Sequence, residues 1–384
     1  MKILLYDMGS YIQKDLIYYL KQGGCTCRNI LYKSTNRYHD TYFEKKFSQI
    51  LSEDSYDCVM STNFFPIVAQ ICYKNNIKYL SWSYDSPINL DDIEYLQYPT
   101  NYAFFFDNND VLTLQKSGGI QIYHLPLAVN VERLNRITIS NTEHQKYHCD
   151  ISFIGQFYQN SLDNLMQILP DYTKGYIDAL VETQMRIYGY NLLEEVIPED
   201  FVSQINNILF AQNITEKLTR RGLIQSIEKK ITRTERIVLL QMLGDMHQVH
   251  FYSSECPKEL SHLYYGGSAY YFNEMPKIFR CSKINLCPTL KSIQSGIPLR
   301  SLDILGSKGS LLVNFQPELA EYFTDGVDVI MYDSMEDAVC KADYYLKHEK
   351  ELLCILEKGY LKVKEQFSYV DRIQTMFKTA GLTF

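Results

Sequence analysis

The stretch KINLCPTLKSIQSGIPLRSLDILGSKGSLLVNF, from Lys283 to Phe315, contains the pattern that decides the fold. It begins with the apolar run KINLCP, passes through a loop, continues as the helix-like SGIPLRSLDILG and ends in a second apolar run, SLLVNF. Two short apolar runs separated by one helix are typical of a strand–helix–strand unit in a parallel sheet. The stretch therefore predicts an α/β architecture.

The same alternation extends outward through most of the chain. It predicts a Rossmann-like domain over residues 1–130 and a second one over 150–365, separated by the polar linker NVERLNRITISNTEHQKYH. Within the second domain, residues 160–246 have mainly helical character and predict a helical insertion. We expect residues 366–384 to form a helix that packs back on the first domain. Two such domains are expected to face each other across a cleft, with ligands bound at the carboxyl ends of the strands.

Charge and hydropathy exclude several classes of protein. The 384 residues carry 38 basic and 45 acidic side chains, a net charge of −7, whereas nucleic-acid and anionic-membrane binders usually have a basic excess. No stretch approaches the roughly 18 apolar residues of a membrane helix. The opening MKILLYDMGS is too short in its apolar part for a signal peptide, since Asp7 ends the run. We therefore expect a cytoplasmic protein without a membrane span or a nucleic-acid partner.

The cysteine and histidine pattern gives no metal site. The ten cysteines include no CxxC pair and are expected to be reduced thiols. Cys25 and Cys27 form a CxC, and His247, His250 and Cys256 lie near one another, but neither set reaches the four ligands of a zinc site. The sequence therefore predicts no bound metal.

The quoted stretch also contains a candidate anion site. Neither a GxGxxG fingerprint nor a GxxxxGK[ST] loop is present, which disfavours NAD-dependent hydride transfer and ordinary ATPase chemistry. Gly296 permits close backbone approach, and Ile297 and Pro298 are predicted to start the helix. Arg300 can fork onto phosphate oxygens, and Asp303, one turn on, can accept hydrogen bonds from ribose hydroxyls. These residues describe a nucleotide-diphosphate site, and a simple Arg–Asp pair on a surface helix explains them equally well.

Longer segments around this site resemble a known family. One long run resembles the carboxyl-terminal domain of the CgeB-like glycosyltransferases, which have a GT-B fold. It extends from INLCPTLKSIQSGIPLRSLDILGSKGSLLVNF through DAVCKADYYLKH, and the earlier segments MPKIFRCSKINL and DISFIGQFY fit the same domain. The family is related in name to a spore maturation protein and has a glycosyltransferase family 1-like C-terminal domain. SWSYDSP, FFFDNNDVLTLQKSGG and HLPLAVN are similar to the amino-terminal domain of that family. The resemblance covers nearly the whole chain, and SGIPLR with the following aspartate is its most specific part.

The resemblance implies a nucleotide-sugar donor, expected to be a UDP-sugar, held by the second domain, with the acceptor near the first and no metal cofactor. Arg300 and Lys291 would meet the diphosphate and Asp303 the ribose. Many GT-B enzymes place two glutamates around this loop with seven residues between them; the later position here is Asp303 and the earlier one is Ser295. The full set of implied donor-binding residues is Gly155, Tyr270, Tyr271, Asn285, Lys291, Ser295, Gly296, Ile297, Arg300 and Asp303.

Three of these residues have a second interpretation. Gly155, after the strand DISFI, either lets the backbone approach the phosphates or is an ordinary turn glycine. Tyr270 and Tyr271 either stack on the base or belong to the core.

Glycosyl transfer to a hydroxyl also needs a base, and the candidates lie in the first domain. Asp85, in SWSYDSP at the carboxyl end of a strand, is the leading one and Asp7 the second, with Asp107 and His124 after them. The alternative for each aspartate is a loop cap, and for the histidine a hydrogen-bonded core position. Inversion and retention are not distinguished.

The partners are less closely defined. The basic run TRRGLIQSIEKKITRTER extends from Thr219 to Arg236 and is interpreted as a solvated helix face or as a binding surface for an acidic acceptor or partner. The helical insertion is also interpreted as a candidate homodimer surface. The resemblance points to bacterial surface or appendage proteins, such as flagellin, or to glycans as acceptors. A nucleotide-sugar epimerase of the same fold and a non-catalytic nucleotide-sugar-binding or assembly protein are the alternative functions.

Overall fold

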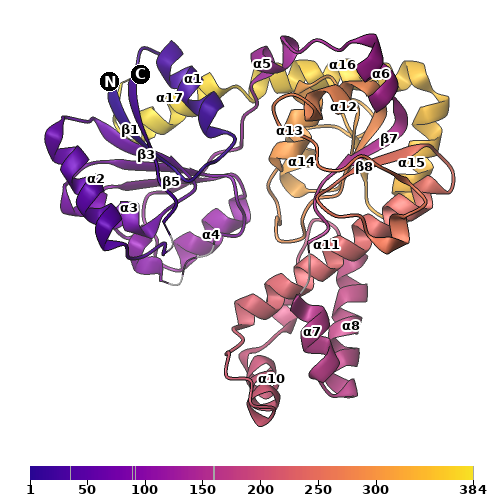
Figure 1. The fold of residues 1–384 in the computed structure, drawn as a ribbon, viewed down its shortest axis with the longest axis horizontal. Helices are drawn as coiled ribbons and strands as arrows, with labels where there is room; N and C mark the ends of the chain where they lie inside the picture. Colours follow the sequence, from indigo (N-terminus) through magenta and orange to yellow (C-terminus); the bar gives the residue numbers. More distant parts are fainter. Residues whose placement is uncertain (35, 89, 91, 159–160, 384) are drawn as a thin grey trace. The chain divides into compact units, whose positions relative to one another are not determined.

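Residues 1–34, 36–88, 90, 92–158 and 161–383 are described by the computed structural model. Their contacts divide the chain into two units (Figure 1). The first unit consists of Met1–Glu132, Gly296–Leu302 and Lys362–Phe384, and the second of Arg133–Ser295 and Asp303–Leu361.

The first unit is built on a six-stranded parallel sheet with the order β2-β1-β3-β4-β5-β6. Every residue of β3 and β4 is buried, as expected of central parallel strands that are covered by helices on both faces. The strands are β1 (Lys2–Asp7), β2 (Thr26–Leu31), β3 (Cys58–Thr62), β4 (Tyr79–Ser83), β5 (Asn101–Phe105) and β6 (Ile122–His124).

Amphipathic helices cover this sheet. In α2 the side chain of Asp40 caps the first turn by accepting a hydrogen bond from the Phe43 amide at 3.0 Å. Phe43 and Phe47 then face the sheet, and burying each stabilises the fold by roughly 1.5–3 kcal/mol. The C-terminal helix α17 belongs to the same unit, because Tyr369 stacks on Tyr19 with ring centroids 5.2 Å apart. The helices are α1 (Gln13–Gln22), α2 (Thr41–Glu53), α3 (Pro66–Lys74), the 3₁₀ turn η1 (Ile93–Leu96), α4 (Asn108–Lys116) and α17 (Tyr369–Thr379).

The second unit repeats the plan with a parallel sheet of order β12-β11-β10-β7-β8-β9. Its core is formed by apolar residues of the central strands and of the helices packed on them. The strands are β7 (Cys149–Ile154), β8 (Val249–Tyr252), β9 (Tyr264–Tyr265), β10 (Ser282–Cys287), β11 (Leu311–Asn314) and β12 (Ile330–Tyr332).

A group of helices interrupts this unit between β7 and β8 and has a hydrophobic core of its own. Figure 1 shows α7, α8 and α10 beyond the edge of the second sheet, while α11 leads back to it. The inserted helices are α7 (Ser161–Ile168), α8 (Asp171–Met185), α9 (Leu193–Val196), α10 (Glu199–Ala211) and α11 (Arg220–Gly244). The remaining elements are α6 (Asn141–Tyr147), the 3₁₀ turn η2 (Lys258–Leu260), α12 (Met275–Cys281), α13 (Leu299–Gly306), α14 (Pro317–Tyr322), α15 (Met335–Lys347) and α16 (Glu349–Gln366), with α5 (Val131–Asn135) where the first unit ends.

The predicted α/β class with two parallel sheets and a helical insertion is confirmed. One local expectation differs from the structure, because the helix expected to start at Ile297 begins at Leu299. The polar segment expected to be a linker contains the helices α5 and α6. Among the described helices, none is both long and apolar enough to cross a membrane.

Candidate functional site

The carboxyl ends of β7, β10 and β11 meet at one edge of the second sheet, because these strands are parallel neighbours. The loops that leave this edge begin after Ile154, Cys287 and Asn314. In open parallel sheets this edge is where ligands bind. Most of the residues predicted to hold a ligand lie on these loops or on α13.

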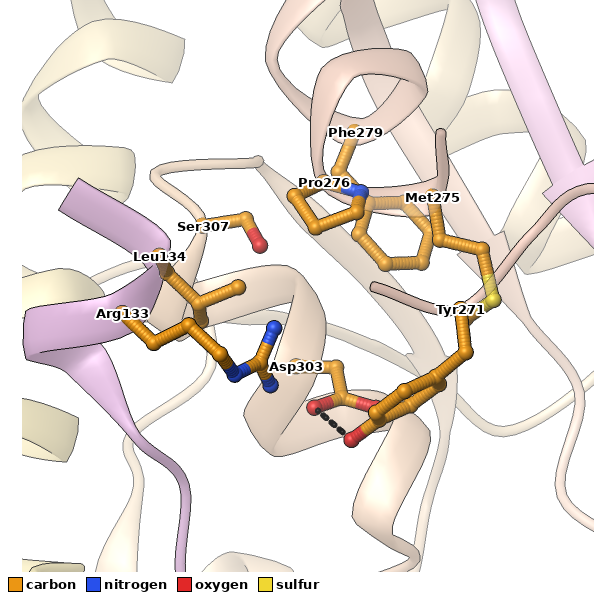
Figure 2. Close-up of a pocket in the computed structure, with 8 residues that line it drawn as sticks. All are labelled: Arg133, Leu134, Tyr271, Met275, Pro276, Phe279, Asp303 and Ser307. Atoms are coloured by element: carbon orange, nitrogen blue, oxygen red, sulfur yellow. Dashed lines mark hydrogen bonds between the residues drawn. The ribbon is translucent and has the colours of Figure 1, made fainter. Parts of the chain in front are cut away.

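Asp303 lies on α13 and is 5% exposed. Its Oδ1 accepts a hydrogen bond of 3.1 Å from the Tyr271 hydroxyl. The guanidinium of Arg133 lies 5.6 Å from the ring centroid of Tyr271 and 5.2 Å from that of Phe272. Figure 2 shows the Arg133 guanidinium and the Tyr271 hydroxyl both turned toward Asp303, with the aromatic and aliphatic side chains of α12 above them. The pocket beside Asp303 is too narrow to admit a water molecule, so the carboxylate faces protein groups.

The other residues of the quoted motif are placed as follows. Ile297 is 1% exposed and belongs to the buried hydrophobic core. Arg300 lies three residues before Asp303 on α13 and is half-buried. Tyr270 is 52% exposed, and its backbone amide donates to the carboxylate of Glu274.

Ser295 makes a contact that the sequence did not predict. Its hydroxyl donates to Oε1 of Glu318 at 2.7 Å, and the Glu318 amide donates to the Ser295 carbonyl at 3.1 Å. Glu318 is 3% exposed and lies in the first turn of α14, directly after β11. A carboxylate thus lies against Ser295, the position at which the resemblance to GT-B enzymes implies a glutamate. The proline before Glu318, at the start of a helix that follows a strand, is the sequence feature that marks the position.

Lys291 belongs to a buried polar cluster with Glu235 of α11 and Tyr188, which lies between α8 and α9. Its ammonium lies 3.4 Å from Oε2 of Glu235 and 4.0 Å from the ring centroid of Tyr188. The Tyr188 hydroxyl donates to the other oxygen of Glu235 at 2.7 Å. Burial, and after it the charge of Glu235, raises the pKa of Tyr188 well above its usual range. The ammonium predicted to meet a diphosphate therefore has a protein carboxylate as its partner here.

Gly155 and Asn285 have clear packing reasons. A Cβ on Gly155 would lie 2.6 Å from the Phe153 ring, so a larger residue would displace that ring. The amide of Asn285 donates to the carbonyls of Phe279 and Ser310 and accepts from the Ser152 hydroxyl at 2.8 Å. Both N–H groups of Asn285 are therefore used inside the sheet, where the residue is 1% exposed.

In the first unit, Asp85 is the predicted base with the most accessible carboxylate. It is exposed after the end of β4, and its Oδ2 accepts a hydrogen bond of 2.7 Å from the amide of Asn63. Asn63 has a φ of 71° and also accepts from the Tyr84 amide at 2.8 Å, so one residue fixes the backbone and the carboxylate together.

The other candidates in the first unit have local roles. Asp7 is 8% exposed, and its Oδ1 accepts from the amides of Gly9 and Ser10 at 2.7 and 3.0 Å, which makes it a loop cap. Asp107 caps α4 by accepting from the Asn109 amide at 3.0 Å. His124 has a ring nitrogen 3.3 Å from the carbonyl of Phe106.

Within the described ranges, no three His, Cys, Asp or Glu side chains are grouped so that they could hold a metal ion.

Comparison with known proteins identifies similarities at two levels. Residues 195–378, just under half of the chain, match the family model described as glycosyl transferase-like. No curated protein matches the sequence significantly.

Solved structures match over nearly the full length. Those similar to this chain include a glycosyltransferase from Rickettsia africae ESF-5 (11% identity, TM-score 0.55, 98% of each chain). Others are a sucrose-phosphate synthase from Thermosynechococcus elongatus (9%, 0.59, 98% of each) and Anabaena Alr3699/HepE in complex with UDP and glucose (9%, 0.52, 99% of each). At such low identity the likeness shows the fold alone, and the predicted GT-B fold is confirmed.

Proposed function

We propose that this protein is a glycosyltransferase that moves a sugar from a nucleotide-diphosphate sugar to a hydroxyl acceptor. The observation that carries the proposal is the match of residues 195–378 to the glycosyl transferase-like family model, within a chain that has the GT-B fold from end to end. UDP is the nucleotide that we favour, because the Anabaena neighbour was crystallised with UDP, glucose and UDP-glucose.

Donor binding is assigned to the second unit and α13. The start of α13 presents the positive end of the helix dipole, and Arg300 adds a fixed positive charge in its first turn. These groups would stabilise the charge that develops on the leaving diphosphate, a task that needs no metal in this assignment. Asp303 would receive the ribose hydroxyls if Tyr271 releases it. Glu318, which Ser295 holds by a hydrogen bond, is the carboxylate that we assign to the donor sugar.

Asp85 is assigned as the base. The acceptor hydroxyl attacks the anomeric carbon, its proton passes to the Asp85 carboxylate, and the bond between the anomeric carbon and the phosphate oxygen breaks, so that the nucleoside diphosphate leaves with the bonding electrons. Asp85 suits this task better than Asp7, because it is exposed and held by one amide donor, whereas Asp7 is used by two backbone amides.

The finer assignments are part of the same proposal. We infer a CgeB-like enzyme of the bacterial cytoplasm, with a surface or appendage protein such as flagellin, or a glycan, as acceptor. The homodimer surface on the inserted helices is also a proposal.

One experiment tests the activity and separates it from the alternatives. The purified protein is incubated with UDP-, GDP-, ADP- and dTDP-sugars in EDTA, with and without a panel of glycoside and protein acceptors, and followed by proton NMR and mass spectrometry. Acceptor-dependent release of nucleoside diphosphate with a sugar added to the acceptor is the expected result. A change in sugar configuration without an acceptor would identify an epimerase, and binding without turnover a non-catalytic protein.

Two variants link that activity to α13. Arg300→Ala and Asp303→Asn should each weaken donor binding by about tenfold or more, the equivalent of one charge-assisted hydrogen bond. Lys229→Ala, which removes an exposed lysine of α11, is the matched control and should bind like the original protein.

A further inference from the structure

The basic run from Thr219 to Arg236 is not simply a solvated face. Near its end, on α11, three polar side chains are buried: Thr232 at 0%, Glu235 at 1% and Arg236 at 7% exposure. Their spacing of three and four residues places them on one side of the helix. Arg233, on the same helix, is instead partly exposed and pairs with Glu255 at 2.7 Å. One face of the helix in this run is therefore buried against the protein.

Arg236 joins the loops that follow two neighbouring strands. Its Nη1 donates to the carbonyl of Gln156, two residues after β7, and its Nη2 donates to the carbonyl of Pro288 at 2.8 Å, one residue after β10. The rings of Phe153 and Tyr158 lie 5.6 and 5.4 Å from the guanidinium carbon. The buried Nε of Arg236 has no hydrogen-bond partner in the part of the chain that the structure describes.

Thr232 and Glu235 contact the loop after β10 at a further residue, Lys291. The Thr232 hydroxyl accepts a hydrogen bond of 3.1 Å from the Lys291 amide, and Glu235 pairs with the Lys291 ammonium at 3.4 Å. One face of α11 thus sets the positions of the backbone around Gly155 and around Lys291. Both segments leave the sheet at its ligand-binding edge.

We propose that Arg236 is a positioning residue for the diphosphate of the nucleotide sugar. It fixes the spacing between the loop after β7 and the loop after β10, so that the backbone of both loops is already in place when the diphosphate arrives. This inference rests on the proposed function and deepens it. An arginine suits the task because its planar guanidinium can donate to two carbonyls at once in a fixed geometry. The single ammonium group of a lysine lies on a flexible side chain and does not fix that geometry. Preorganisation of this kind improves affinity by removing the ordering cost from the binding step.

The test compares two arginines of α11. Arg236→Lys keeps the charge and loses the fork, Arg236→Met loses both, and Arg233→Lys is the matched control away from the two loops. Dissociation constants for UDP, GDP, ADP and dTDP are measured by calorimetry well below the melting temperature of each variant. Arg236→Lys should weaken binding of the preferred nucleotide by about tenfold. In turnover, its donor KM should rise while kcat and the acceptor KM stay unchanged, a split that a loss of stability alone would not produce.

The outcomes separate this inference from the function on which it rests. If the original protein binds none of the nucleotides, both fall. If it binds one and Arg236→Lys binds it equally well, the positioning role is overturned and the proposed function stands. Should Arg236→Met fail to fold, the lysine variant decides. A second measurement uses the unaltered protein: the bound nucleotide should slow hydrogen exchange of the amides in residues 154–158 and 289–291, and unchanged exchange there despite measurable binding would overturn the proposal.

Discussion

The buried pair of Glu235 and Lys291 gives the sharpest stability prediction. The Glu235 side chain is 1% exposed, that of Lys291 is 9% exposed, and the charged atoms lie 3.4 Å apart. In Glu235→Gln the amide oxygen can still accept the Tyr188 hydroxyl, but the ammonium of Lys291 loses its carboxylate while it remains out of water. Leaving one charge of a buried pair uncompensated costs about 3–5 kcal/mol. We therefore expect the free energy of unfolding to fall by about 3 kcal/mol, the low end, because Lys291 retains the face of the Tyr188 ring.

The assay is urea unfolding followed by far-UV circular dichroism. Fluorescence is less suitable, because the sole tryptophan, Trp82, lies in the first unit and the pair lies in the second. Adding Lys291→Met to Glu235→Gln removes the stranded charge and should recover most of the loss. The exposed pair of Lys347 and Asp343 is the control, and Lys347→Met should change stability by less than about 0.5 kcal/mol.

Two results would refute this reasoning. A cost below about 1 kcal/mol for Glu235→Gln would mean that the pair behaves like a surface pair. Full additivity in the double variant would mean that the two side chains are not coupled, whatever their distance.

Three further changes have defined outcomes. Asp85→Asn should lower kcat by about 10²- to 10⁴-fold, the usual contribution of a general base, with an unchanged melting temperature, and near-normal turnover in a steady-state assay would remove Asp85 from the mechanism. Gly155→Ala should lower the free energy of unfolding by about 1–3 kcal/mol, because its Cβ would meet the Phe153 ring at 2.6 Å, and urea titration of the alanine variant checks this. The hydrogen bond from Lys277, followed by those from Ser140, lowers the pKa of Glu143 to about 2. The ionised Glu143 therefore contributes to stability above the usual carboxylate pKa, and this contribution is lost as pH falls toward 2. The difference in melting temperature between the original protein and Glu143→Gln should vanish over that acid range, and a difference that persists at pH 2 would contradict the assignment.

The fold was predictable because it follows from local patterns. Buried parallel strands such as β3 and β4 are short apolar runs, and the helices between them repeat apolar residues every three or four positions, as Phe43 and Phe47 do in α2. The two-residue strand β9 was not predicted, because Tyr264 and Tyr265 are exposed and too few to form a pattern.

The partners of the candidate residues were not predictable in the same way. Lys291 was expected to face an anion, and nothing in its neighbourhood in the sequence points to Glu235, which lies on the inserted helices. Glu318 was overlooked because its contact with Ser295 spans 23 positions and joins the loop after β10 to the first turn of α14. A single sequence gives the residue types at a site, whereas the pairing of buried polar groups depends on which distant segments fold against one another.

The inserted helix α11 has a different role in the structure from the one that its charge pattern predicts. As a sequence, the segment from Thr219 to Arg236 is a basic run, and charge alone predicts a solvated helix face or a binding surface for an acidic acceptor. In the structure, the same helix packs its N-terminal half into the core of the insertion and its C-terminal half against the second sheet, where α11 contacts β8 and α15. A helix that is shared between two cores cannot be removed without exposing both. Deleting the insertion would therefore also remove the contacts of Arg236 and Glu235 with the loop segments after β7 and β10, and the insertion is better understood as a support of these loops than as an appended module.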